Sequence, residues 1–320
     1  MSTIPTAAGT IDSGQLGNTL VHEHVFSLGE EYRLNYDREW DEEEKVAQAV
    51  SDLNGLKALG IDSILDPTVL GLGRYIPRIQ TVAQQTELNI VVATGLYTFN
   101  ELPPQFSYRG PGEILDVPEP LTELFIKDIT EGIGDTGVRA AFLKCAIDQP
   151  GLTWGVERTM RAVAQASAET GAPITVHTHA SSETGLVAQK LLLEEGADPA
   201  RIVIGHSGDT TDLDYLTKLA DNGSLLGMDR FGIDKFLPFE QRVATVVELV
   251  RRGYTDSIVI SHDASCYIDF FEDPTVFGEN WNYRHISEDV LPALREAGVG
   301  EDDIDTILVK NPRRYFEQGS

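Results

Sequence analysis

The chain has 320 residues, of which 41% are hydrophobic and 24% charged, an ordinary composition for a globular protein with a large core. Asp and Glu total 51 against 25 Lys and Arg, which gives a formal net charge of −26. A field of this sign repels phosphate backbones and anionic lipids, so we expect no nucleic-acid partner and no membrane association. Two cysteines, no leader pattern and no apolar run of about 18 residues predict a soluble cytoplasmic protein.

Eight short apolar runs alternate with segments of helical period. The predicted strands cover residues 19–24, 61–67, 89–95, 138–144, 173–179, 201–206, 224–230 and 256–263. The predicted helices cover residues 42–59, 74–87, 120–132, 154–170, 183–195, 212–222, 238–252 and 287–298. Strands this apolar are typical of a parallel sheet that is buried on both faces. We therefore predict an α/β fold, a (β/α)8 TIM barrel, as a single domain over residues 1–320.

An open, doubly wound sheet is the alternative fold, but a Gly-rich phosphate loop does not follow the first predicted strand. Two connections are longer than a barrel needs, residues 96–119 and 264–286, and both are rich in aromatic residues. Residues 7–18 are predicted to form a small hairpin that closes the N-terminal end of the barrel.

Six side chains that bind metals or protons lie at the carboxyl ends of the predicted strands. They are His22, His24, Lys144, His177, His206 and Asp263. In a barrel these ends converge on one face, where the active site lies. His22 and His24 are two residues apart, so they share a face of their strand. Each side chain alone has a structural explanation, and the prediction of a metal site depends on the whole set.

The motifs around these residues resemble one known family. The stretches 22-HEH-24, 142-FLK-144, 176-VHTHA-180, 203-VIGHSGDTTDLDYL-216 and 261-SHD-263 are similar to those of the phosphotriesterase family in the amidohydrolase superfamily. The resemblance extends from residue 8 to about residue 315. Within this family, the chain most resembles the phosphotriesterase-like lactonases.

This resemblance implies two divalent metal ions. His22, His24 and Asp263 would bind the buried ion, and His177 and His206 the more exposed one. The remaining ligand would be Lys144, carboxylated by CO2, which would bridge both ions together with a hydroxide. An ammonium beside two dications would be repelled, whereas a carbamate is an anionic bridge. Zinc is the first candidate for these donors, with cobalt, manganese or iron as the others.

The catalytic candidates are Asp263, Tyr97, Arg230 and Asp209. By the resemblance, Asp209 matches a position proposed to relay a proton away from Asp263. Tyr97 in 95-GLY-97 and Arg230 in 227-GMDRFG-232 stand where organophosphate hydrolases tend to carry Trp and His. The lactonases resemble this chain at both positions.

Those lactonases open N-acyl-homoserine lactones, the quorum-sensing signals of bacteria, and often hydrolyse organophosphates weakly. We therefore expect quorum-quenching lactonase activity, with the Tyr97 phenol donating a hydrogen bond to the lactone carbonyl. This chain has Ser265 where those enzymes often have Cys, which affects the shape expected for the acyl pocket. The expected partners are a small lactone substrate and a second copy of the chain in a homodimer.

Three other functions are compatible with parts of this pattern. An organophosphate phosphotriesterase would use the same machinery, and turnover of an aryl triester separates it from a lactonase. A mononuclear, deaminase-like enzyme lacks the bridging lysine, so Lys144 argues against it. A non-enzymatic metal-binding protein would have a site closed by ligands, which the long aromatic loops disfavour.

Overall fold

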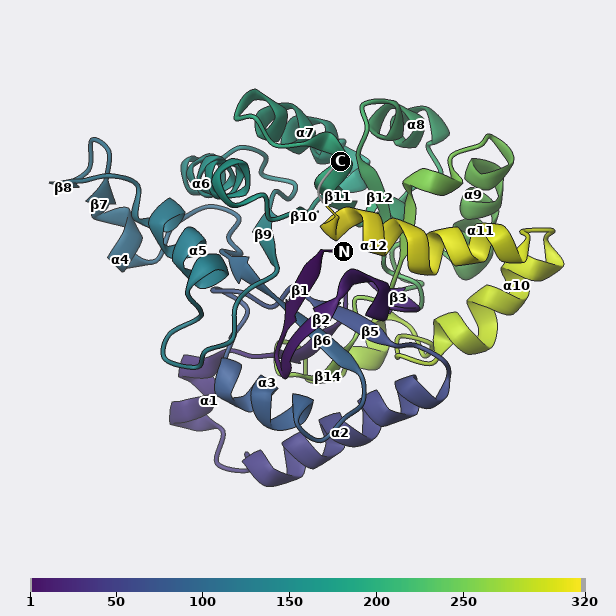
Figure 1. The fold of residues 1–320 in the computed structure, drawn as a ribbon, viewed down its shortest axis with the longest axis horizontal. Coiled ribbons are helices and arrows are strands. Elements are labelled where there is room, and N and C mark those ends of the chain that lie inside the picture. Colours follow the sequence, from purple (N-terminus) through teal and green to yellow (C-terminus); the bar gives the residue numbers. More distant parts are fainter. Residues whose placement is uncertain (1, 318–320) are drawn as a thin grey trace.

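A parallel sheet of eight strands forms the wall of a barrel (Figure 1). The computed structural model describes residues 2–317. Residue 1 and residues 318–320 of the predicted domain lie outside the described residues. In chain order the strands are β3 (Thr19–Leu20), β5 (Ser63–Asp66), β6 (Asn89–Gly95), β9 (Phe142–Ala146), β10 (Ile174–His177), β11 (Ile202–Gly205), β12 (Leu225–Met228) and β13 (Ile258–Ile260). Each pairs with the next in parallel register, so the predicted (β/α)8 barrel is confirmed.

The barrel closes where the last strand meets the first. The Val21 amide lies 3.5 Å from the Ile260 carbonyl oxygen, and the Asp263 amide donates to the His22 carbonyl at 3.0 Å. Beyond this point β14 (Ser265–Ile268) pairs in parallel with β4 (His24–Ser27). The predicted first strand, residues 19–24, is therefore broken near His22 into β3 and β4, and part of the predicted loop 264–286 is a strand.

Helices cover the outside of the barrel between successive strands (Figure 1). They are α2 (Glu42–Ala58), α3 (Ile76–Ala83), α5 (Pro120–Thr130), α6 (Trp154–Thr170), α7 (Thr184–Glu194), α8 (Leu213–Asp221) and α9 (Phe239–Arg251), and after the last strand α10 (Leu291–Glu296). The helix predicted over 287–298 begins instead with a π-helical turn, Ile286–Val290. Two further helices that the sequence pattern did not indicate are α11 (Glu301–Asp305) and α12 (Asn311–Phe316).

Local sequence explains where these helices begin and end. Asp41 caps α2, because its carboxylate accepts hydrogen bonds from the amides of Glu43 and Glu44. Thr153 caps α6 in the same way through the amide of Val156. Gly171 ends α6 with φ of 73°, a left-handed conformation that favours glycine at this position.

Alternation along the strands divides the buried residues into two layers. Leu65 and Val91 face the barrel interior, whereas their neighbours Ile64 and Ile90 pack under the helices. On β9, Phe142 lies in the interior and Cys145 lies in the outer layer. This period of two carries functional side chains inward at the strand ends.

The N-terminal end of the barrel is covered by both ends of the described chain. The hairpin of β1 (Thr3–Thr6) and β2 (Gly9–Asp12) lies at the near side of Figure 1, together with α12. The Ala7 amide donates to the carbonyl of Ile90 near the start of β6, and the hydroxyls of Tyr315 and Thr175 are 2.9 Å apart. The hairpin is thus formed earlier in the chain than residues 7–18, and the opposite end of the barrel is free for a site.

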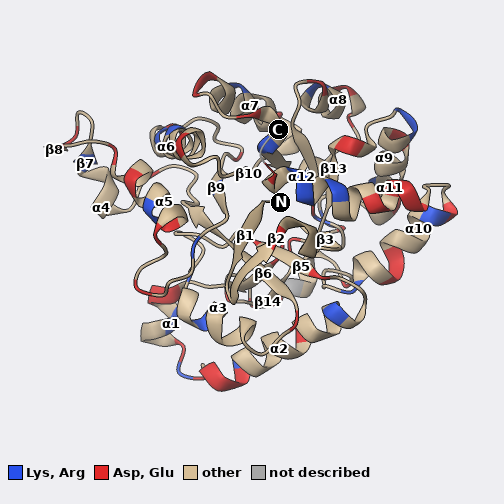
Figure 2. Cartoon of the chain, viewed as in Figure 1, with Lys and Arg blue, Asp and Glu red and all other residues tan. Residues whose placement is uncertain are grey.

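The long connection 96–119 contains α4 (Pro104–Ser107) and the short pair β7 (Arg109–Gly110) and β8 (Leu115–Asp116), which project from the barrel in Figure 1. Before α2 lies the short helix α1 (Glu30–Tyr36). Acidic residues occur on outer elements such as α2 and α11 (Figure 2). No helix among residues 2–317 is long and apolar enough to cross a membrane.

Candidate metal centre and active site

The carboxyl ends of the strands surround a cavity of about 160 Å³. Every residue predicted for the site except Asp209 lines it: His22, His24, Tyr97, Lys144, His177, His206, Arg230 and Asp263. Gly95 permits close packing beside Lys144. A Cβ there would lie 1.8 Å from the Lys144 carbonyl oxygen, so only glycine lets β6 approach β9 so closely.

The first ligand group lies at the barrel seam. The Nε2 atoms of His22 and His24 are each 3.3 Å from Oδ1 of Asp263. Lys144 Nζ is also 3.3 Å from Nε2 of His22. These are the residues for which the sequence predicted a buried metal site, and they converge within the reach of one ion.

The second group is formed by the ends of β10 and β11. His177 Nδ1 and His206 Nε2 are 2.8 Å apart, and the two rings are nearly perpendicular at 78°. His206 has a φ of 62° and Asp263 a φ of 56°. Left-handed backbone is uncommon outside glycine and clusters at functional sites, so the chain holds both residues in conformations that cost free energy.

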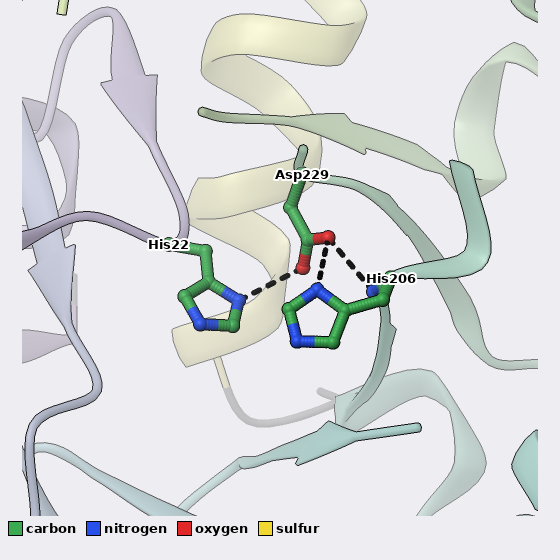
Figure 3. A group of neighbouring side chains, drawn as sticks. All are labelled: His22, His206 and Asp229. Atoms are coloured by element: carbon green, nitrogen blue, oxygen red, sulfur yellow. Dashed lines mark hydrogen bonds and ion pairs between the residues drawn. The ribbon is translucent and has the colours of Figure 1, made fainter. Parts of the chain in front are cut away.

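Carboxylates that the sequence analysis missed fix the outer nitrogens of these rings. Asp229, fully buried after β12, accepts hydrogen bonds from Nδ1 of His22 at 2.8 Å and Nδ1 of His206 at 2.9 Å (Figure 3). Asp148 accepts one from Nε2 of His177 at 2.6 Å. Asp229 directly precedes Arg230 at a strand end, so the strand-end criterion that selected the other residues also applies to it.

His24 is oriented through a hydroxyl. Its Nδ1 lies 2.7 Å from the Thr68 hydroxyl, which donates to Asp66 at the end of β5. Since the outer nitrogen of each ring donates its proton outward, the inner nitrogens carry lone pairs. Such partners are the usual outer shell of metal-bound histidine.

The donor set fits metal ions. Two imidazole lone pairs 2.8 Å apart, at His177 and His206, repel each other unless a cation lies near both. Burial lowers the pKa of His177 to about 4 and that of His206 well below its usual value, so protons do not supply that cation near neutral pH. Groups that could hold an ion include His22, His24 and Asp263. The geometry therefore favours bound divalent metals.

Lys144 is an unusual lysine. Its side chain is buried inside the barrel at the centre of the donor set, and burial lowers its pKa to about 8. A sizeable fraction of the amine is therefore neutral near physiological pH. A neutral amine is the nucleophilic form of lysine.

Arg230 separates two of the predicted catalytic residues. Its Nε donates to Asp263 Oδ2 at 2.9 Å and its Nη1 to Asp209 Oδ2 at 3.0 Å. The other Asp209 oxygen is 2.8 Å from Nη2 of the buried Arg242. Burial alone would lower the pKa of Arg230, but Asp209 and Asp263 outweigh it and raise the pKa. A guanidinium has no acceptor, so no proton passes through it from Asp263 to Asp209.

The mouth of the cavity is apolar. Tyr97 lies beside the second ligand group, with its hydroxyl 3.4 Å from Nδ1 of His177, and burial raises the pKa of this phenol. The phenol is therefore a neutral hydrogen-bond donor. The rest of the lining includes Ser27 and Ser265 but is otherwise aliphatic and aromatic: Leu72, Ile233, Phe236, Ile268, Phe270, Phe271, Phe277 and Trp281.

Comparison with known proteins assigns the chain to a family. The phosphotriesterase family model matches residues 2–316. The chain belongs to the phosphotriesterase family. Its activity class is therefore that of a phosphotriesterase-family hydrolase.

Relatives in the phosphotriesterase family match nearly the whole chain. A phosphotriesterase homology protein of Mycobacterium tuberculosis is 54% identical, over 99% of this chain and 98% of its own. An aryldialkylphosphatase of Saccharolobus solfataricus is 42% identical, over 96% of this chain and 97% of its own. The solved structure of the phosphotriesterase from Mycobacterium tuberculosis superposes with a TM-score of 0.97 at 55% identity, covering 99% of this chain and 98% of that one.

Proposed function

We propose that this phosphotriesterase-family hydrolase is a binuclear metal-dependent lactonase that opens N-acyl-homoserine lactones and acts weakly on phosphotriesters. The observation that carries the proposal is the two-part cavity. Its floor is a set of nitrogen and oxygen donors for metals, and its mouth is apolar and aromatic. A neutral ester with an apolar tail matches both parts, because the carbonyl belongs at the floor and the tail at the mouth.

The metal ligands follow from the two groups. His22, His24 and Asp263 would hold one ion, and His177 and His206 the other. Two bound ions, with zinc the first candidate, would activate a water and polarise the ester carbonyl. Lys144 supports the carbamate bridge, since its buried amine has a pKa of about 8 and its neutral form is the one that reacts with CO2.

The chain's own side chains account for the remaining chemistry. The Tyr97 hydroxyl donates a hydrogen bond to the carbonyl oxygen as negative charge develops there. The Asp263 carboxylate takes the proton of the attacking water while the new C–O bond forms. When the ring C–O bond breaks, Asp263 returns that proton to the alkoxide. Arg230 fixes the orientation of Asp263 throughout.

The Arg230 contact favours a lactone over an aryl triester. The alkoxide released from a lactone is strongly basic and stays tethered to the product, so it takes the proton directly from Asp263. An aryloxide leaving group is weakly basic, and the proton then has to leave Asp263 by another route. The route to Asp209 is interrupted by the guanidinium.

A phosphotriesterase is the second candidate, because the Saccharolobus solfataricus relative bears the name aryldialkylphosphatase. The test is a comparison of kcat/KM for homoserine lactones of graded acyl length with kcat/KM for an aryl dialkyl phosphate, on metal-loaded protein. We expect the lactones to be preferred and longer tails to lower KM. A preference for the triester would refute the lactonase proposal. The homodimer and the cytoplasmic location stay predictions.

A further inference from the structure

Glu23 is a fully buried acid between the two histidines of the first ligand group. Its Oε1 accepts hydrogen bonds from the Ser261 hydroxyl at 2.7 Å, the His262 amide at 2.8 Å and His262 Nδ1 at 2.7 Å. Its Oε2 accepts a bond from the Ala264 amide at 3.0 Å. All four partners are donors, and Glu23 is not among the residues that line the cavity. The carboxylate therefore acts on the chain around it and not on a substrate.

The residues that Glu23 binds lie on both sides of Asp263. Asp263 has a φ of 56°, and a non-glycine residue keeps this strained conformation only when the structure around it imposes it. One carboxylate holds the amide before Asp263 and the amide after it. The Trp281 indole reinforces this turn, because Nε1 donates to the carbonyls of His262 and Asp263, each at 3.1 Å.

The same segments carry the other two ligands of this group. The Asp263 amide donates to the His22 carbonyl at 3.0 Å, and the His24 amide donates to the Ala264 carbonyl at 2.8 Å. The His22 amide donates to the Ser261 hydroxyl, which in turn donates to Glu23. Glu23 therefore ties strand one and strand eight together at the point where each supplies ligands.

We propose that Glu23 is a positioning residue that imposes the left-handed turn at Asp263 and so sets the affinity of the buried metal site. The inference rests on the metal site of the proposed function but not on the identity of the substrate. A glutamine would keep the volume of the side chain, but its NH2 group would face a donor where Glu23 offers an oxygen. Glu23→Gln therefore disturbs the turn without opening a cavity.

The test measures metal affinity, by competition of Co2+-loaded protein with a chelator of graded concentration. For Glu23→Gln we expect one of the two equivalents to bind about 10–100-fold more weakly, the range for lost outer-shell partners. Asp128→Asn is the matched control. Asp128, on α5, is also buried and accepts bonds from Thr94 of β6 and from Arg74, and none of the three lines the cavity. Asp128→Asn should lower the thermal midpoint of unfolding without changing the affinity for either metal equivalent.

A milder variant keeps the test valid if Glu23→Gln does not fold. Ser261→Ala removes the hydroxyl between Glu23 and the His22 amide, and we expect a several-fold loss of affinity at the same equivalent. The inference would be overturned if Glu23→Gln kept the metal affinity of the parent protein, or lost no more affinity than Asp128→Asn does. If only Ser261→Ala folds, the same outcomes in that variant would overturn it. A parent protein that binds no metal would refute the proposed function as well, so the two failures are distinguishable.

Discussion

Asp148 gives a sharp test of how the two ligand groups differ. Among the histidines of the two ligand groups it contacts only His177, through a 2.6 Å hydrogen bond, while its other oxygen accepts from the Gln149 amide, and its side chain is 26% exposed. A hydrogen bond to a charged group contributes about 1.5–3 kcal/mol, and exposure favours the lower end. Since 1.4 kcal/mol is a factor of ten, Asp148→Ala should weaken one metal equivalent about tenfold. The expected cause is a ring that rotates freely and a less basic Nδ1.

Chelator titration followed by elemental analysis measures this effect, because it separates the two equivalents. Asp148→Asn is the matched control, since its amide oxygen still accepts from His177 and should retain most of the affinity. Asp229 contacts a histidine of each group, so Asp229→Ala should weaken both equivalents. Equal weakening of both ions in Asp148→Ala, or no change in either, would refute the division of the site into two groups.

Three further predictions concern single groups. Lys144→Ala should lose activity and metal, measured by elemental analysis, and added short carboxylic acids should restore part of both; normal metal content would mean that the lysine is only structural. Removing one oxyanion donor costs up to about 10²–10³-fold in rate. Because the metals share this task, Tyr97→Phe should reduce the rate by less than that, and the reduction should be larger on lactones than on triesters. Equal reductions on both substrates would contradict the role assigned to Tyr97. Burial lowers the pKa of His177 from 6.5 to about 4, so the unfolded state binds more protons between these values and metal-free protein should lose stability as the pH falls from 6.5 to 4. Thermal midpoints across that range check this, and a flat profile would contradict it.

The barrel was predictable because it depends on patterns that local sequence contains. Apolar runs give buried strands, and barrel geometry carries residues such as Lys144 and His177 to one face. Similarity to the family, and not the strand-end rule, singled out Tyr97 and Arg230, which also line the cavity. Sequence similarity then supplied the pairing into two ligand groups.

The parts that the sequence did not reveal depend on contacts between distant segments. Asp229 stands at a strand end and meets the criterion that selected the metal ligands, but its role and that of Asp148 depend on hydrogen bonds to rings on other strands, and no local pattern encodes those contacts. Strand one was predicted as one piece over residues 19–24, but it breaks near His22, where pairing passes to the last strand. The helices α11 and α12 escaped prediction because they are short, and a π-helical turn, Thr306–Lys310, lies between them.

The barrel seam also bears on how the molecule folds. The bonds of Asp263 to His22 and of Ala264 to His24 join residues about 240 positions apart in a chain of 320. Contacts of such long range form slowly, because the intervening chain loses entropy before they are made. During synthesis, the first ligand group is incomplete until residue 263 has left the ribosome. A chain truncated before that residue has no seam to close, so the side chains of the first ligand group do not come together.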